Sequence, residues 1–290
     1  MDGLPYIDVP LSFGPINTFG VLMALGVLFG SWLARKYVER NGMDEEVLRW
    51  LGIRLIVWGF VGAFLLNTVF YEWDRLVDDP WGTIKGLGIS SYGAIVAGAV
   101  AFFYYTHVKK LDRRAWADMA AWGAAGGWVL GRLGCAVVHD HLGQKTDSAF
   151  GVNVPPFKYP FDRSAEVIRA HDLGLYEFFV WVALLLALVL LERWKGRKPG
   201  FLLGFLAVAY SIPRFFFEYL RFSETDPRYA GLTFAQWSSI AFFVWGLWLI
   251  LAPARTREEA PEGRAVAGAA PAPSGGGGRA GARKKKKRRT

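Results

Sequence analysis

The sequence predicts an all-α fold: a polytopic membrane protein with about seven transmembrane helices, an N-terminus outside and a C-terminus in the cytoplasm. Three observations predict it. Of the 290 residues, 53% are hydrophobic and 16% are aromatic, which is unusually apolar for a soluble protein. Seven apolar stretches are long enough to cross a bilayer as helices. Lysine and arginine collect in every second connection between these stretches.

The seven predicted spans fill most of residues 1–252, which we expect to form one transmembrane domain. Their predicted bounds are 17–35, 52–71, 89–107, 115–138, 174–192, 200–221 and 232–252. Two spans are less uniformly apolar than the others. The second contains Arg54 and Asn67, and the fourth contains Arg132.

The basic connections predict the orientation of the spans. Lysine and arginine are concentrated in residues 34–40, 108–114 and 192–199, which fall on one side if there are seven spans. Cytoplasmic loops are enriched in these residues, so this side is expected to be cytoplasmic. The long connection 139–173 is then expected outside.

The net charge of +9 belongs almost entirely to the end of the chain. Residues 253–290 carry a charge of +8, which leaves +1 for residues 1–252. This end is rich in Gly, Ala and Pro, so we expect a disordered, basic cytoplasmic tail. The tail can attach to anionic lipid, or its positive charge can determine the orientation of the spans as a topology determinant. We favour the second interpretation. No folded nucleic-acid-binding module accompanies it, so no nucleic-acid partner is expected.

The sixth predicted span carries a row of polar side chains. Tyr210, Arg214, Glu218 and Arg221 follow one another at spacings of four, four and three, which place them on one helical face. Charged side chains within a membrane are costly and often mark a functional site. The alternative is a purely structural role. Arg214 and Glu218 would form an ion pair that helps the helices to pack, and the side chain of Arg221 would extend to the membrane interface.

Arg132 of the fourth span is expected near the outer side of the membrane, which Arg221 of the sixth span also approaches. Two or three guanidinium groups at one point would bind an anionic oxygen group, because arginine binds phosphate bidentately and stays charged when buried. A phospholipid phosphate is the expected ligand. This pattern alone is compatible with a lipid-binding protein and with a lipid-modifying enzyme.

His139, Asp140 and His141 follow the fourth span directly. Two histidines fall short of the three or four ligands of a typical metal site, so we predict no metal. An acid/base role is simpler, because imidazole titrates near neutral pH. The alternative is a hydrated loop with polar residues that cap the helix. Cys135, the single cysteine, is expected to be a small hydrophobic residue and not a nucleophile.

Several motifs together resemble one family, the prolipoprotein diacylglyceryl transferases. The resemblance runs over most of residues 12–252. The most specific piece is "YSIPRFFFEYLR" (210–221), which is similar to the family's Tyr-x-x-x-Arg-x-x-x-Glu-x-x-Arg helix. The other pieces, in chain order, are "NTFGVLMALGVLFGSWLA", "GRLG" (131–134), "LYE" (175–177) and "GLTFAQWSSI" (231–240).

The resemblance implies an enzyme of the bacterial inner membrane without a metal or organic cofactor. Such an enzyme moves the diacylglyceryl group of phosphatidylglycerol to the lipobox cysteine of a preprolipoprotein signal peptide, and glycerol phosphate leaves. It implies catalytic roles for Arg132, Asp140 and Arg214, with Asp140 standing where the family has glutamate. Substrate binding would fall to Tyr210, Glu218 and Arg221.

The third span departs from the family pattern. In "ISSYGAIVAG" (89–98), Tyr92 stands at the family's histidine and Ala94 at a glycine. In the second span, Phe64 stands where the family usually has arginine. Two explanations remain. His139 or His141 supplies the missing imidazole and Tyr92 only binds substrate, or the chain is a paralogue that binds or transports anionic phospholipid without this reaction.

Overall fold

The computed structural model describes the chain in several segments. They are residues 3–7, 9, 12–13, 16–86, 88, 90–156, 158–159, 166–222 and 228–253. Apart from Pro253, the predicted basic tail lies outside these residues, so its disorder and its role stay predictions.

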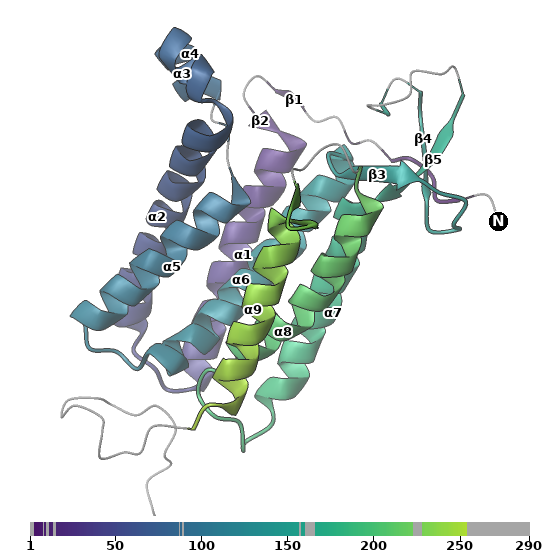
Figure 1. Ribbon diagram of the computed structural model, residues 1–290. Coiled ribbons are helices and arrows are strands. Elements are labelled where there is room, and N and C mark those ends of the chain that lie inside the picture. The colour runs from purple at the N-terminus through teal and green to yellow at the C-terminus, as the bar shows by residue number, and fades with distance from the viewer. Residues whose placement is uncertain are drawn as a thin grey trace, which may run out of the picture.

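The described chain is mainly a bundle of long helices (Figure 1). Each of the seven predicted spans forms a helix, and two short helices occupy the connection between the second and third spans. The helices are α1 Thr18–Arg40, α2 Glu45–Tyr71, α3 Trp73–Asp78, α4 Pro80–Gly86, α5 Ser91–Val108, α6 Arg113–Val138, α7 Leu173–Glu192, α8 Phe201–Phe217 and α9 Phe234–Leu251.

The predicted polytopic membrane protein is confirmed at the level of its helices. Among the described residues, six helices are long and apolar enough to cross a membrane: α1, α2, α6, α7, α9, and α8 with the turn that follows it. Helix α5, which has 18 residues and carries the polar sequence YYTH near its end, is not among the six, but it runs beside α2 (Figure 1). The predicted orientation of the termini stays a prediction.

Helices α1 and α6 approach each other closely because glycines line their contact. A Cβ atom at Gly30 would collide with the carbonyl group of Gly123, and one at Gly26 would lie 2.9 Å from the carbonyl oxygen of Gly127. Small residues at such contacts let helix backbones pack tightly in membranes. The tight contact fixes α6, the helix that carries Arg132.

A buried carboxylate joins α6 to the start of α8. Asp118 accepts hydrogen bonds from the backbone N–H groups of Gly200 at 2.9 Å, Leu202 at 2.9 Å and Leu203 at 3.1 Å. The first N–H groups of a helix have no partner within it, and a carboxylate there also interacts favourably with the helix dipole. Asp118 therefore fixes the start of α8 against α6.

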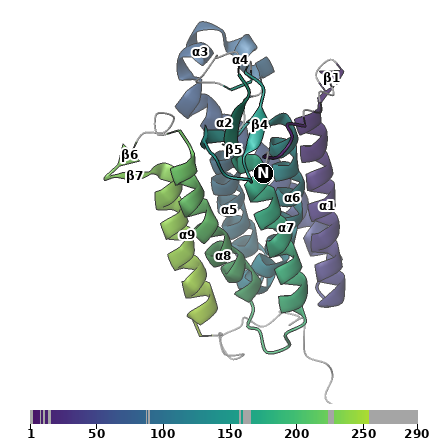
Figure 2. The same ribbon diagram turned by 90° about the vertical axis from the view of Figure 1, so that its right-hand side faces the viewer.

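Short strands add to the predicted all-α fold at one end of the bundle. The connection 139–173 contains an antiparallel sheet in the order β3-β5-β4, formed by Leu142–Lys145, Ile168–Asp172 and Val152–Val154. Figure 2 shows β4 and β5 of this sheet near the start of α7. Two-stranded pairs are formed by β1 Ser12–Phe13 with β2 Ile16–Asn17, and by β6 Arg228–Tyr229 with β7 Leu232–Thr233.

The N-terminal segment lies against this sheet. Leu4 bridges to Val152, and its backbone carbonyl accepts a hydrogen bond from the N–H group of Asn153 at 2.9 Å. The sheet has a small core of its own, formed by Val152, Val154, Tyr159, Ile168 and Ala170. We call this end of the bundle the sheet end.

Candidate functional site

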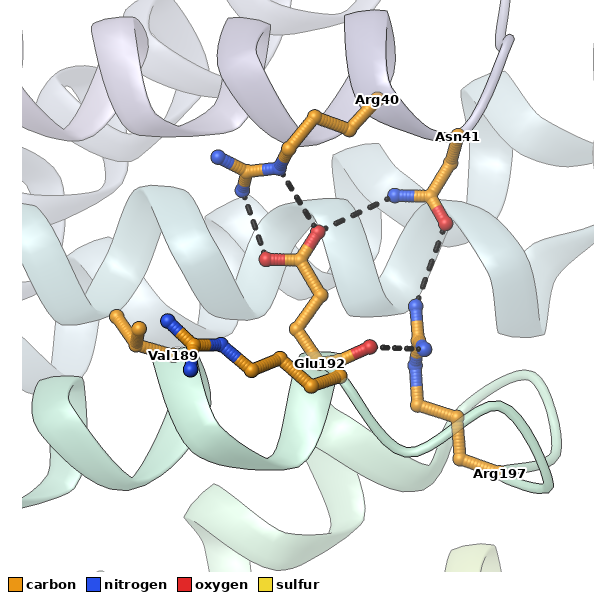
Figure 3. Close-up of a pocket in the computed structure, with 6 residues that line it drawn as sticks. Arg40, Asn41, Val189, Glu192 and Arg197 are labelled. Carbon is orange, nitrogen blue, oxygen red and sulfur yellow. Dashed lines mark hydrogen bonds and ion pairs between the residues drawn. The ribbon is translucent and has the colours of Figure 1, made fainter.

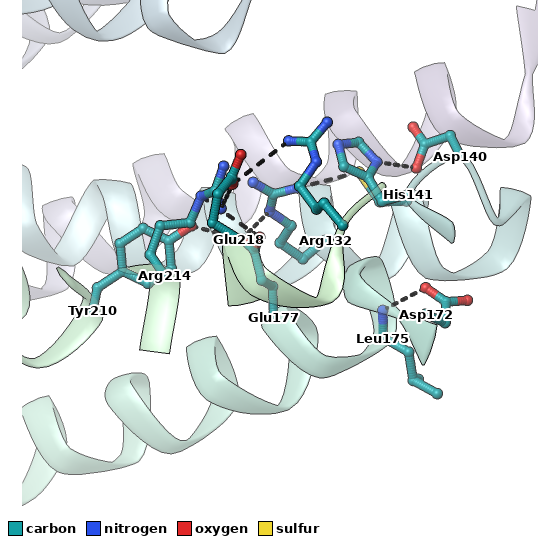
Figure 4. Close-up of polar contacts among 11 residues, drawn as sticks. Arg132, Asp140, His141, Asp172, Leu175, Glu177, Tyr210, Arg214 and Glu218 are labelled. Carbon is teal, nitrogen blue, oxygen red and sulfur yellow. Dashed lines mark hydrogen bonds and ion pairs between the residues drawn. The ribbon is translucent and has the colours of Figure 1, made fainter. Parts of the chain in front are cut away.

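A buried carboxylate, Glu177 in the first turns of α7, brings two helices together near the sheet end. Its Oε2 atom lies 2.9 Å from Nε of Arg132 and accepts a 2.6 Å hydrogen bond from the Tyr210 hydroxyl. Its Oε1 atom lies 4.0 Å from Nε of Arg214. Figure 4 shows these side chains converging from α6, α7 and α8. The predicted meeting of Arg132 with the polar face of the sixth span is confirmed.

The polar face of α8 continues into a short 3₁₀ helix at Glu218–Leu220. Oε2 of Glu218 lies 2.7 Å from Nη1 of Arg214 and 3.9 Å from Nη1 of Arg221. The ion pair between Arg214 and Glu218, which the sequence offers as an alternative to a functional site, is present. Glu177 and Glu218 are two carboxylates whose ion pairs join the three arginines.

The arginines differ in their access to solvent. The side chains of Arg132 and Arg214 are 14% and 13% exposed, whereas that of Arg221 is 31% exposed. Glu177 is only 4% exposed. The carboxylate is therefore the inner part of the cluster. The guanidinium groups lie further out, where an anionic group can reach them.

Tyr92 lies in the first turn of α5, near the start of the third predicted span. Its ring packs edge-to-face on Phe234 of α9, with the ring centroids 4.9 Å apart. It is also close enough to Arg214 and Glu218 to interact with them electrostatically. Tyr92 thus belongs to the arginine cluster.

His141 and Asp140 form a second polar group beside Arg132 (Figure 4). Nδ1 of His141 lies 2.5 Å from Oδ1 of Asp140, and both side chains are about one-third exposed. Cys135 connects this pair to the cluster, because its sulfur lies 3.9 Å from Nη1 of Arg132. His141 is therefore an accessible imidazole near the arginines.

The structure does not bring His139 into this cluster. Its Nδ1 atom lies 2.6 Å from Oδ2 of the fully buried Asp172, and its Nε2 atom lies 3.2 Å from the carbonyl oxygen of Ile7. Its ring stacks on Tyr6 with centroids 4.1 Å apart. Since both ring nitrogens have partners, His139 joins the N-terminal segment to the start of α7, where Asp172 also caps the helix.

The two histidines do not form a metal pair. In the part of the chain that the structure describes, the one group of three possible ligands consists of Cys135, Asp140 and His141, whose ligand atoms lie within 4.8 Å of one another. Three ligands can suffice for a catalytic zinc site. The positively charged guanidinium group of Arg132 lies beside the Cys135 sulfur and disfavours the binding of a metal cation there.

Sequence reasoning missed the residue at the centre of the cluster. The sequence identifies Glu177 only as part of the motif "LYE", although a glutamate within an apolar span is the same signal that identifies Arg132. Asp118 and Asp172 were missed for a similar reason. Each stands near the start of a helix segment, where a polar residue is ordinary in sequence.

Comparison with known proteins agrees with this geometry. The model of the family described as prolipoprotein diacylglyceryl transferase matches residues 8–252. The chain belongs to this family. The family match contains every residue of the arginine cluster and ends where the basic tail begins.

Several family members are similar over nearly their whole length. The phosphatidylglycerol–prolipoprotein diacylglyceryl transferase of Thermosynechococcus vestitus is 31% identical over 251 residues, which cover 84% of this chain and 91% of the relative. The enzyme of the same name from Gloeobacter violaceus is 30% identical over 258 residues, covering 85% and 92%. That of Chloroherpeton thalassium is 29% identical over 248 residues, covering 82% and 89%.

Proposed function

We propose that this chain is a phosphatidylglycerol–prolipoprotein diacylglyceryl transferase. It would transfer the diacylglyceryl group of phosphatidylglycerol to the thiol of a lipobox cysteine. The observation that carries the proposal is the convergence of Arg132 and Arg214, from different helices, on Glu177. The guanidinium groups of Arg132 and Arg214, which are 14% and 13% exposed, can donate hydrogen bonds to the oxygen atoms of a phosphodiester.

In this reaction the thiolate sulfur attacks the diacylglyceryl carbon that is bonded to the phosphate oxygen. The carbon–sulfur bond forms as the carbon–oxygen bond breaks, and the bonding electrons leave with glycerol phosphate. Negative charge therefore grows on the phosphate in the transition state. Guanidinium groups fixed beside that phosphate stabilise this charge, and the carboxylate behind them keeps them in place.

A base must accept the thiol proton, because an ordinary cysteine has a pKa of about 8.5 and is mostly protonated at neutral pH. His141 is our candidate, with Asp140 holding its ring. Its exposure allows a peptide to reach it, whereas the ring of His139 is closed in. Tyr92 would then bind substrate through its hydroxyl group.

The bacterial inner membrane is the proposed location. Six helices that are long and apolar enough to cross a bilayer support a membrane location, and the basic connections predict that the sheet end faces outside. Phosphatidylglycerol of the outer leaflet and the signal peptide of an exported preprolipoprotein would then meet at the arginine cluster.

The test is transfer by the purified full chain in detergent containing phosphatidylglycerol. A synthetic lipobox peptide should gain the mass of one diacylglyceryl group, and its cysteine-to-serine version should not. Absence of product, under conditions in which the Gloeobacter violaceus relative is active, would refute the proposal.

A second candidate is a protein that binds or transports anionic phospholipid without this reaction. Tyr92 at the family's histidine position favours it. This candidate predicts that the purified protein retains phosphatidylglycerol and forms no peptide product. The same assay therefore separates the two functions.

A further inference from the structure

A basic pocket lies at the opposite end of the bundle from the sheet. It has a volume of about 430 Å³ and is lined by the ends of α1 and α7 and by the loop after α7. The lining residues are Arg40, Asn41, Val189, Glu192, Arg193 and Arg197. Figure 3 shows Arg40 and Asn41 of the α1 end reaching Glu192 at the end of α7.

This pocket is separate from the arginine cluster. Glu177 and Glu192 stand fifteen residues apart on α7, which corresponds to about 22 Å along a helix. The two places therefore lie near opposite surfaces of the bilayer, and one phosphate group cannot occupy both.

The pocket is held together by contacts that leave positive charge uncompensated. Glu192 receives two hydrogen bonds from Arg40, at 3.0 and 2.8 Å, which neutralise that arginine. Arg197 donates to the carbonyl groups of Glu192 at 2.6 Å and Trp194 at 3.3 Å and to the Asn41 amide at 3.3 Å, and it also interacts electrostatically with the buried Asp118. Within the described residues, the side chain of Arg193 has no hydrogen bond or ion pair.

The apolar surface beside the pocket points to a lipid as its ligand. Val189 lines the pocket and is 39% exposed, and Leu186, one turn earlier on α7, is 60% exposed. Positions three apart share a helix face, so an apolar strip leads from the charged pocket toward the membrane interior. Free phosphate would have no use for such a strip, whereas acyl chains would cover it.

We propose that this pocket binds the phosphate group of an anionic phospholipid in the leaflet opposite the arginine cluster. Arg193 supplies the unbalanced charge, Arg197 also lines the pocket, and Val189 and Leu186 contact the acyl chains. Basic pockets between helix ends are a general mode of headgroup recognition. The proposal does not depend on the transferase activity, because it uses other residues at the other end of the bundle.

The experiment counts lipids by native mass spectrometry on the full chain, purified in nonionic detergent and depleted of lipid. Phosphatidylglycerol is titrated against phosphatidylcholine with the same acyl chains. We expect Arg193→Gln to weaken one phosphatidylglycerol binding event about five-fold, the effect of roughly one basic residue near a headgroup. Transfer activity should stay unchanged. Lys195→Gln is the matched control, since it removes the same charge from the same loop outside the pocket lining.

Three results would overturn the proposal. Unchanged phosphatidylglycerol binding in Arg193→Gln would show that Arg193 does not bind the lipid. An equal loss in Lys195→Gln would mean that only the general charge of the loop matters. Complete displacement of the lipid by inorganic phosphate at equal concentration would assign the pocket to free phosphate.

Discussion

Replacement of Glu177, the central carboxylate of the arginine cluster, tests whether this residue positions the arginines for the reaction or contributes to substrate binding. Glu177→Gln preserves the shape of the side chain and one acceptor oxygen but removes the charge between Arg132 and Arg214. The net charge of the cluster becomes more positive by one, so binding of anionic phosphatidylglycerol should not weaken. The arginines lose the charge that fixes them, and a displacement of about 1 Å at a reacting centre can lower a rate about 100-fold.

We therefore expect kcat to fall about 100-fold with an unchanged or lower KM for phosphatidylglycerol. Hydrogen bonds to charged groups contribute about 1.5–3 kcal/mol each, so thermal unfolding in detergent should also occur at lower temperature. The assay measures initial rates of peptide modification against phosphatidylglycerol concentration. Glu46→Gln, the same change at an exposed position on α2, is the control. An unchanged kcat in a folded Glu177→Gln protein, or a loss confined to KM, would refute the positioning role.

Three further predictions follow from the polar contacts. His141→Ala should lower the transfer rate about 100-fold or more, as expected for a general base, whereas His139→Ala should mainly lower the unfolding temperature; equal transfer rates in the two variants would contradict our assignment. Cys135→Ala should keep the transfer rate within about three-fold of wild type, since a small apolar residue replaces another of similar size. A chelator should not change the transfer rate, and a loss of transfer on chelation would indicate a metal at that site. Asp118→Asn should destabilise the fold by about 1–3 kcal/mol, because its carboxylate binds three backbone N–H groups; unfolding curves that superimpose on those of wild type would argue against this.

The arginines and the polar face of α8 could be predicted from the sequence, because polar side chains stand out within apolar membrane spans. Arg132 and Arg214 stand in otherwise apolar segments, and the spacing from Tyr210 to Arg221 places the whole set on one face. The same energetic argument identifies Glu177 once every charged residue of the spans is considered. These parts of the site depend on helix periodicity, which is visible in sequence.

The roles of the two neighbouring histidines could not be predicted in the same way. His139 ends α6 in a left-handed conformation, with a φ of 51°. The backbone reversal separates His139 from His141, and the partner of His139, Asp172, comes from thirty-three residues later. Such long-range pairing leaves no periodic signal in the sequence. The small sheet between α6 and α7 was missed because its strands are only three to five residues long.

The contacts of Asp118 have a consequence for how the arginines meet a substrate. Helices α6 and α8 are joined near their starts by the contact of Asp118 with Leu202. They are joined again through Glu177, which contacts Arg132 fourteen residues further along α6 and Arg214 twelve residues further along α8. Two helices joined at both ends have little freedom to slide or splay between those points. The separation of Arg132 and Arg214 is thus set when the chain folds, and the entropy of ordering them is lost then and not during binding. A lipid that enters the site meets a preformed anion receptor, so its own chain ordering becomes the main entropic cost of forming the complex.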